Sequence, residues 1–319
     1  MENKISGLHH ITAIAGDPQR NHDFYTRTLG LRMVKQTVNF DDPQTYHLYY
    51  GDEVGTPGTI LTFFPWPGVR QGKKGAGMAT ETGYAVPKGS LGFWKKRFEN
   101  HGVTHDRIHE RFGEKYLPFR DPDGLWLSLT EPKNHDNREG WEIPGITKDE
   151  AIKGFHSVTL TLNNISKTAG LLTSVFGYSL QEKDGNISRY RAEAAEEAAI
   201  INLLEMPGAS RGVNAGGTIH HVAFRVKDRQ QQMDIRDKVL QEGLYATEQI
   251  DRDYFFSVYF REPGGVLFEI ATDKPGFMID ETREQLGTSL QLPDRYEPMR
   301  ERIEGVLPEL KTGKKTHAQ

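Results

Sequence analysis

The chain repeats one pattern four times, and this repetition constrains the fold more than any other feature. Each copy begins with a short apolar strand, continues into a helix that reaches a glycine, and closes with further strands. The glycines that follow the helices are Gly30, Gly102, Gly177 and Gly243. Glycine commonly follows a helix end because it adopts the left-handed conformation at little cost. The closing strands, at 58–63, 124–129, 199–204 and 265–270, also match. Each copy is therefore predicted to be a βαβββ module.

A module of this size cannot bury its sheet alone, so modules must pack in pairs. We predict an α+β protein in which four βαβββ modules form two pseudo-barrel halves. Residues 1–135 are expected to hold the first and second modules and 136–150 a linker. The third and fourth modules would occupy 151–273 and a charged C-terminal tail 274–319. We expect the tail to be a surface strap or frayed end, with a lid or dimer arm as the alternative.

Composition excludes several classes of function. With 319 residues and 36% hydrophobic side chains the chain can bury a core, and its net charge of -4 favours neither nucleic acid nor an anionic membrane as partner. No apolar run approaches the ~20 residues of a membrane-spanning helix, and the first residues lack the pattern of a signal peptide. The absence of cysteine excludes disulfides, thiolate metal sites and cysteine nucleophiles. We expect a cytoplasmic protein, with a homodimer as the default assembly.

Two segments, 7–12 and 218–223, each place adjacent histidines at the start of an apolar strand. Neighbouring strand residues point to opposite faces, so only one histidine of each pair is expected to reach a shared metal. The strand face of His221 is mixed, which suits a lined cavity, whereas that of His220 is apolar. His10 and His221 are therefore the better ligand candidates, and His9 and His220 are expected to support or pack around the site.

Glu269 stands alone inside the apolar strand 266–270. A buried lone carboxylate is costly unless it is paired or bound to a metal, and an ion pair with a nearby arginine or lysine is the alternative. Two histidines and one carboxylate form the minimal set that holds a non-haem Fe(II) with open positions.

The repeat supplies an internal control for this ligand set. In the third module Ser157 takes the position of His10 and His221, and in the second module the nearest residue is Glu81 or Tyr84. The positions that correspond to Glu269 hold Thr62, Ser128 and Asn202. Only the first and fourth modules keep metal-binding side chains, so we predict that the first module pairs with the fourth and the second with the third.

Four segments, 7–17, 45–52, 55–60 and 263–269, resemble the vicinal oxygen chelate superfamily of glyoxalases, bleomycin resistance proteins and extradiol dioxygenases. More closely, they resemble its hydroquinone ring-cleaving dioxygenases. That branch includes the dichlorohydroquinone dioxygenases and the methylhydroquinone-responsive enzymes of bacilli. Ordinary extradiol catechol dioxygenases differ because their ligands lie in the third and fourth modules.

The resemblance implies an Fe(II)-dependent enzyme, with Mn(II) as the other metal, that cleaves hydroquinone-type diols and adds both atoms of O2. It implies His10, His221 and Glu269 as metal ligands. It also implies catalytic residues around the metal, namely His9, Thr12, His220, Arg252 and Tyr259. His220 or His9 would accept the substrate proton, and Arg252 and Tyr259 would stabilise the developing oxyanion or hold the distal hydroxyl. His47 is interpreted as a packed strand residue, with a position facing the cavity as the alternative.

Two other functions are compatible with the pattern. A glyoxalase-like isomerase or lyase would use zinc or nickel without oxygen, and it would want a fourth ligand in the position held by Thr62. A non-catalytic protein that binds an aromatic compound would need no metal, so the retained ligand set argues against it.

Overall fold

The computed structural model describes residues 4–312 and contains four βαβββ units. The first unit comprises β1 (Leu8–Ala15), α1 (Pro18–Asp23) with a following turn of π-helix (Phe24–Thr28), β2 (Arg32–Asn39), β3 (Asp42–Gly51) and β4 (Ile60–Pro65). The second comprises β5 (Met78–Ala85), α2 (Leu91–Asn100), β6 (His109–Arg111), β7 (Glu114–Arg120) and β8 (Trp126–Thr130). Among the described residues no helix is long and apolar enough to cross a membrane.

The second half of the chain repeats the same order of elements. The third unit comprises β9 (Gly154–Leu162), α3 (Ser166–Ser174), β10 (Tyr178–Asp184), β11 (Ile187–Ala192) and β12 (Ile200–Glu205). The fourth comprises β13 (Thr218–Val226), α4 (Arg229–Gln241), β14 (Ile250–Asp251), β15 (Phe255–Arg261) and β16 (Leu267–Pro275). The glycines expected after the four helices all have positive φ, as the predicted caps require.

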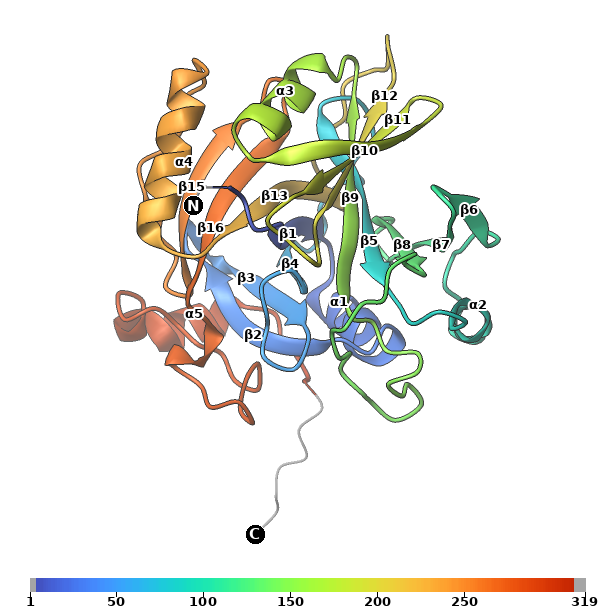
Figure 1. Ribbon diagram of the computed structural model, residues 1–319. Helices are drawn as coiled ribbons and strands as arrows, with labels where there is room; N and C mark the ends of the chain where they lie inside the picture. Colours follow the sequence, from blue (N-terminus) through green and yellow to red (C-terminus); the bar gives the residue numbers. More distant parts are fainter. Residues whose placement is uncertain (1–3, 313–319) are drawn as a thin grey trace.

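The strands form two eight-stranded sheets that combine units from opposite ends of the chain. One sheet has the order β14-β15-β16-β13-β1-β4-β3-β2 and the other β10-β11-β12-β9-β5-β8-β7-β6. Figure 1 shows the blue first unit beside the orange fourth unit, and the teal second unit beside the green third. The predicted pairing of the first module with the fourth and of the second with the third is therefore confirmed.

Within each sheet the two units join through their first strands. β1 pairs with β13 in one sheet and β5 with β9 in the other, both antiparallel, while within each unit the first strand pairs in parallel with the last. Every residue of β1 is buried. The two strands at the centre of the first sheet thus come from residues about 200 positions apart. Side chains on the same face of these two strands point into one interior.

The tail packs along the first unit as a strap over the part that the structure describes; residues 313–319 lie outside the described residues. Its short helices are Phe277–Ile279, Glu297–Met299 and α5 (Arg300–Val306). Lys35 of β2 is fully buried, and its Nζ donates to Asp280 Oδ1 and Glu281 Oε2, each at 2.5 Å. Further along, the Tyr46 hydroxyl donates to Pro308 O at 2.9 Å. Buried charge and hydrogen bonds therefore attach this segment to the sheet.

Replacing Lys35 with alanine should lower the free energy of unfolding by about 3 kcal/mol, because removal of one partner leaves the buried Glu281 carboxylate uncompensated. Urea denaturation followed by circular dichroism measures the change. Arg283→Ala, which removes an exposed ion pair with Glu53, is the matched control and should cost less than about 1 kcal/mol. Equal losses in the two variants would contradict the assigned role of Lys35.

The interior of the second sheet holds a different charged cluster. Glu114 Oε2 accepts from Arg189 at 2.6 Å and lies 3.2 Å from His156 Nε2. Burial alone would raise the pKa of Glu114, but its contacts with His156 and Arg189 lower it to about 2. The ionised carboxylate thus stabilises the folded chain.

A carboxyl group whose pKa is lower in the folded than in the unfolded chain stabilises the fold at pH values above its unfolded-state pKa. This contribution is lost as the pH falls towards 2. We expect it to amount to about 3 kcal/mol. The stability difference between wild type and Glu114→Gln should therefore be large at pH 6 and shrink at pH 3, measured by urea denaturation at each pH. Glu110→Gln on the neighbouring exposed strand β6 serves as the control. A difference that does not change with pH would refute this linkage.

Candidate metal centre

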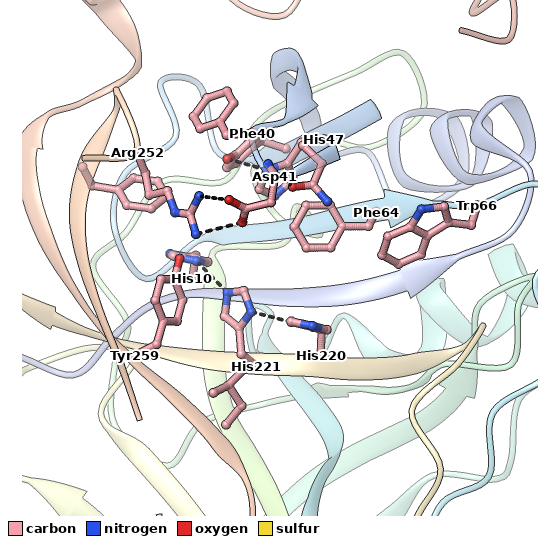
Figure 2. A pocket seen from close by; sticks show the side chains of 14 residues that line it. His10, Phe40, Asp41, His47, Phe64, Trp66, His220, His221, Arg252 and Tyr259 are labelled. Carbon is pink, nitrogen blue, oxygen red and sulfur yellow. Dashed lines mark hydrogen bonds and ion pairs between the residues drawn. The ribbon is translucent and has the colours of Figure 1, made fainter. Parts of the chain in front are cut away.

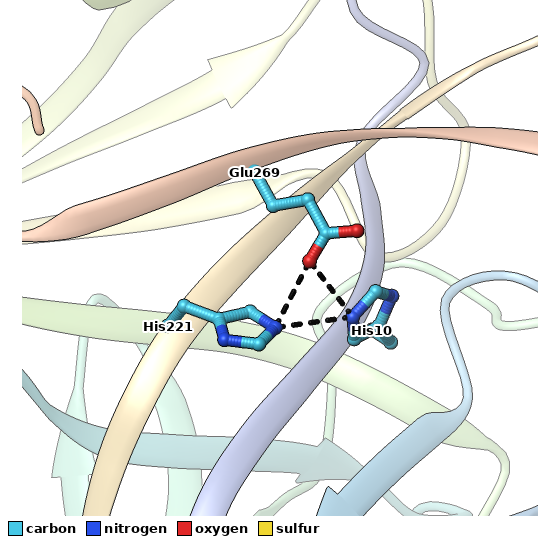
Figure 3. A group of neighbouring side chains, drawn as sticks. All are labelled: His10, His221 and Glu269. Carbon is cyan, nitrogen blue, oxygen red and sulfur yellow. Dashed lines mark hydrogen bonds and ion pairs between the residues drawn. The ribbon is translucent and has the colours of Figure 1, made fainter. Parts of the chain in front are cut away.

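Three ligand atoms from three adjacent strands meet in the first sheet. His10 Nε2 of β1, His221 Nε2 of β13 and Glu269 Oε2 of β16 form a triangle with sides of 3.3, 3.2 and 2.9 Å (Figure 3). All three side chains are buried. The antiparallel register of β1 and β13, in which Thr12 lies opposite His221, places the two imidazoles on the same interior face.

The triangle has the size that a metal ion requires. Nitrogen and oxygen ligands bind a divalent ion such as zinc at about 2.0–2.2 Å, which puts neighbouring ligand atoms roughly 3 to 3.5 Å apart. The observed sides match this spacing. No other group of three or more such ligands was found among the described residues.

The carboxylate of Glu269 also fits a bound cation. Its Oε1 accepts from the Ser257 hydroxyl at 2.5 Å, whereas Oε2 is buried and accepts no hydrogen bond. A buried carboxylate oxygen without a donor is costly unless a cation compensates it. The neighbours of Glu269 in the structure are histidines and a serine, so the alternative of an arginine or lysine partner is not what the structure shows.

His9 sets the proton position on His10. Since the carbonyl of Thr272 can only accept, His9 Nε2, at 3.1 Å, must carry the proton of that bond. Burial and the neighbouring His10 lower the pKa of His9 well below its usual value, so His9 is neutral and its Nδ1 accepts. His10 Nδ1 donates to it at 2.9 Å. The lone pair of His10 Nε2 is thereby directed into the triangle, as a metal ligand requires.

His220 repeats this arrangement on the other strand. Its Nδ1 lies 2.8 Å from His221 Nδ1. Burial and the adjacent His221 lower the pKa of His220 to about 3, so its ring is neutral. When His221 keeps its Nε2 lone pair free, its Nδ1–H donates to His220 and leaves the His220 Nε2–H free to donate. Unlike His9, His220 lines a cavity.

The strand register confirms the internal alignment of the modules. His10 lies two residues before the partner of Thr62, and His221 two residues before the partner of Glu269. By the same count Glu81 takes this position in the second module, which settles the choice between Glu81 and Tyr84. The other equivalent residues also match the alignment, namely Ser157 with Asn202 and Glu81 with Ser128.

A cavity of about 280 Å³ opens onto the histidines. Its walls are mainly aromatic, with Phe40, Tyr49, Phe64, Trp66, Phe255 and Tyr259. Figure 2 shows Arg252 facing Asp41, with Tyr259 and His221 below them. The Arg252 guanidinium lies 5.5 Å from the Tyr259 ring, and burial raises the pKa of Tyr259, which keeps its hydroxyl protonated.

The structure separates the predicted residues into two groups. His10, His220, His221, Arg252 and Tyr259 line the cavity. His9, Thr12 and Glu269 lie behind the wall, where each contacts a neighbour of the site. His9 and Thr12 can therefore act on a bound molecule only through other residues.

Sequence reasoning missed a hydrogen-bonded chain that includes two cavity residues. His47 Nε2 and Nδ1 each lie 2.8 Å from a hydroxyl, of Thr62 and of Tyr49 respectively, and Thr62 bonds to Thr12 at 2.8 Å. His47 and Tyr49 both line the cavity, so His47 takes the alternative position that faces the cavity. The repeat could have revealed this, since Tyr49 faces Thr62 as Tyr259 faces Glu269. Asp41, in the turn between β2 and β3, had no such signal.

Related sequences share the whole length of the chain. A protein of Bacillus subtilis (strain 168) named ring-cleaving dioxygenase MhqO is 50% identical over 309 residues, covering 97% of this chain and 98% of that protein. The chlorohydroquinone/hydroquinone 1,2-dioxygenase of Sphingobium indicum is 37% identical and covers 94% of this chain and 95% of its own length. These relatives confirm the predicted resemblance to the hydroquinone branch.

Solved structures agree with the fold. A crystal structure titled as a dioxygenase from Bacillus subtilis superposes with a TM-score of 0.92 at 48% identity, covering 98% of this chain and 99% of that one. Glyoxalase I from Zea mays shares the fold alone, with a TM-score of 0.63 at 14% identity over 84% of this chain and 92% of its own. Residues 7–129 and 154–270 match the family described as the Glyoxalase/Bleomycin resistance protein/Dioxygenase superfamily. The chain belongs to this superfamily.

Proposed function

We propose that this protein is an Fe(II)-dependent ring-cleaving dioxygenase that acts on hydroquinone-type aromatic diols and adds both atoms of O2. The main support for this proposal is the triangle of two histidines and one glutamate beside an aromatic cavity. The names of the relatives, among them a chlorohydroquinone/hydroquinone 1,2-dioxygenase, support the substrate class.

His10, His221 and Glu269 would hold the metal. Two histidines and one carboxylate with open positions are typical of non-haem Fe(II) oxygenases, and Mn(II) is the other ion that this set would accept. Bound there, Fe(II) would activate a diol and O2 for reaction with each other. The protein contributes orientation and a cavity from which water is partly excluded.

The cavity suits one substituted aromatic ring. An apolar cavity of about 150 Å³ accommodates benzene, so a cavity of about 280 Å³ has room for a ring with two hydroxyls and a small substituent. Phe64 and Phe255 offer apolar surface to such a ring, and Phe255 lies 4.9 Å from the His10 ring. The ring would therefore bind next to the metal triangle.

The polar groups of the wall would hold the diol oxygens. His220 would donate its free Nε2–H to the oxygen beside the metal, and the protonated Tyr259 hydroxyl would donate to developing negative charge. Arg252, next to Tyr259, would keep that hydroxyl in place. The binding of His9 to Thr272 leaves it the role of orienting His10. Since His220 would act as a donor, neither histidine takes the expected role of accepting the substrate proton in this arrangement.

A zinc or nickel isomerase is less well supported. Such an enzyme would want a carboxylate at the position of Thr62, whose hydroxyl instead bonds to Thr12 and His47. Three protein ligands leave more positions open for small molecules than four would.

Glu269→Gln should lower bound Fe(II) by at least about tenfold after anaerobic loading and gel filtration, since ligand loss removes the charge that binds the cation. Iron content measured by inductively coupled plasma spectrometry provides the readout. Glu81→Gln, at the equivalent of His10 in the second module, is the matched control and should retain iron. Equal iron content in wild type and Glu269→Gln would rule out this ligand assignment.

The Fe(II)-loaded protein should consume oxygen rapidly with methylhydroquinone and slowly with catechol, measured with an oxygen electrode. With ¹⁸O2, mass spectrometry should find both labelled atoms in the ring-opened product. A preference for catechol would move the enzyme to another substrate class. No uptake with either diol, despite bound iron, would contradict the proposed activity.

A further inference from the structure

We propose that Asp41 makes this cavity reject hydroquinones that carry an anionic ring substituent, so that the substrates are uncharged para-diols. The inference rests on the proposed function and names the residue that narrows its substrate class. It follows from the charges on the cavity wall and from how Asp41 is held.

Among the described residues that line the cavity, Arg252 is the one lysine or arginine and Asp41 the one carboxylate. The two form a two-pronged ion pair, with Arg252 Nη1 and Nη2 3.2 and 3.0 Å from the Asp41 oxygens. Figure 2 shows the pair across the cavity from His221. The cation that could receive an anionic substituent is thus already occupied.

An anionic ring substituent could bind this cavity in two positions, and both are unfavourable. It could displace Asp41 from Arg252, whose planar fork matches carboxylate geometry. Otherwise it would lie beside the Asp41 carboxylate, where like charges repel. The Arg252 side chain is 18% exposed and that of Asp41 is 73% exposed. Solvent therefore screens the repulsion by Asp41, and the larger cost is the loss of the partly buried Arg252 as a binding partner. A ring with an uncharged substituent neither displaces Asp41 from Arg252 nor is repelled by the Asp41 carboxylate.

The turn that carries Asp41 is held in place. The Asp41 amide donates to Asn39 Oδ1 at 3.0 Å. The carbonyl of Phe40 accepts from the Tyr296 hydroxyl of the tail at 2.7 Å, and Arg295 lies 4.9 Å from the Phe40 ring. Since the strap fixes the turn from outside, Asp41 cannot move away from the cavity mouth by a simple shift of the turn.

The test compares methylhydroquinone with 2,5-dihydroxybenzenesulfonate. The sulfonate group is ionised at every working pH and is a weak metal ligand. Its effect on affinity therefore measures the charges of the cavity wall and not binding to the metal. Binding of each compound is measured by isothermal titration calorimetry with Fe(II)-loaded protein under nitrogen, where no turnover occurs. Oxygen uptake gives kcat/KM for each compound separately.

In Asp41→Asn and Asp41→Ala the affinity for the sulfonate, relative to wild type, should rise roughly tenfold, because Arg252 is then free to bind it. Asp41→Glu keeps the charge and should keep the discrimination. Glu53→Gln removes one negative charge from an exposed ion pair outside the cavity and should behave like wild type.

Two results would overturn the role of Asp41: tight binding of the sulfonate by wild type, or unchanged sulfonate affinity in both Asp41 variants. Failure of the proposed function has a different signature. Absence of oxygen uptake by wild type with methylhydroquinone would refute the dioxygenase, whereas the sulfonate affinities would still decide the role of Asp41.

Discussion

The antiparallel pairing of β1 with β13 is the contact on which the rest of the site depends. It joins the first and last of the four units and fixes the register in which Thr12 lies opposite His221. A slip of one residue would turn His10 or His221 to the other face of the sheet. The parallel pairing of β13 with β16 then brings in Glu269 from the same interior face. These two strand pairs thus bring His10 and His221, which are 211 residues apart, together with Glu269 in a triangle with sides near 3 Å.

The side chains that contact His10, His221 and Glu269 explain why the candidate site is built from adjacent histidine pairs. His9 and His220 contact the Nδ1 atoms of His10 and His221, respectively. The Nε2 lone pairs of His10 and His221 therefore face the centre of the triangle. Ser257 holds the remaining oxygen of Glu269. The equivalent of Ser257 in the first unit is His47, which holds Thr62 instead of a carboxylate. The same architecture therefore supports the carboxylate of the candidate metal centre in one unit and a hydrogen-bonded hydroxyl in the other.

The sequence predicted the fold because its elements repeat, and it predicted that His10, His221 and Glu269 would lie together. Periodic strands and cap glycines recur four times, and comparison of the copies identified His10, His221 and Glu269 as the side chains that differ from the common pattern. The cavity wall was predicted less completely. His47 bonds to hydroxyls from its own and neighbouring strands, and its exposure to the cavity depends on how β3 curves. Asp41 lies in a turn, and its position over Arg252 follows from packing of the tail, which no local pattern encodes.

The most direct test of the account is electron paramagnetic resonance of the Fe(II)-loaded protein with nitric oxide, which occupies the position that O2 would take. Three protein ligands leave room for nitric oxide and a diol together. We therefore predict the half-integer-spin signal of an iron–nitrosyl complex, and a change in its line shape when methylhydroquinone is added. Iron-loaded protein that gives no nitrosyl signal, or one that methylhydroquinone leaves unchanged, would contradict an open metal site formed by His10, His221 and Glu269.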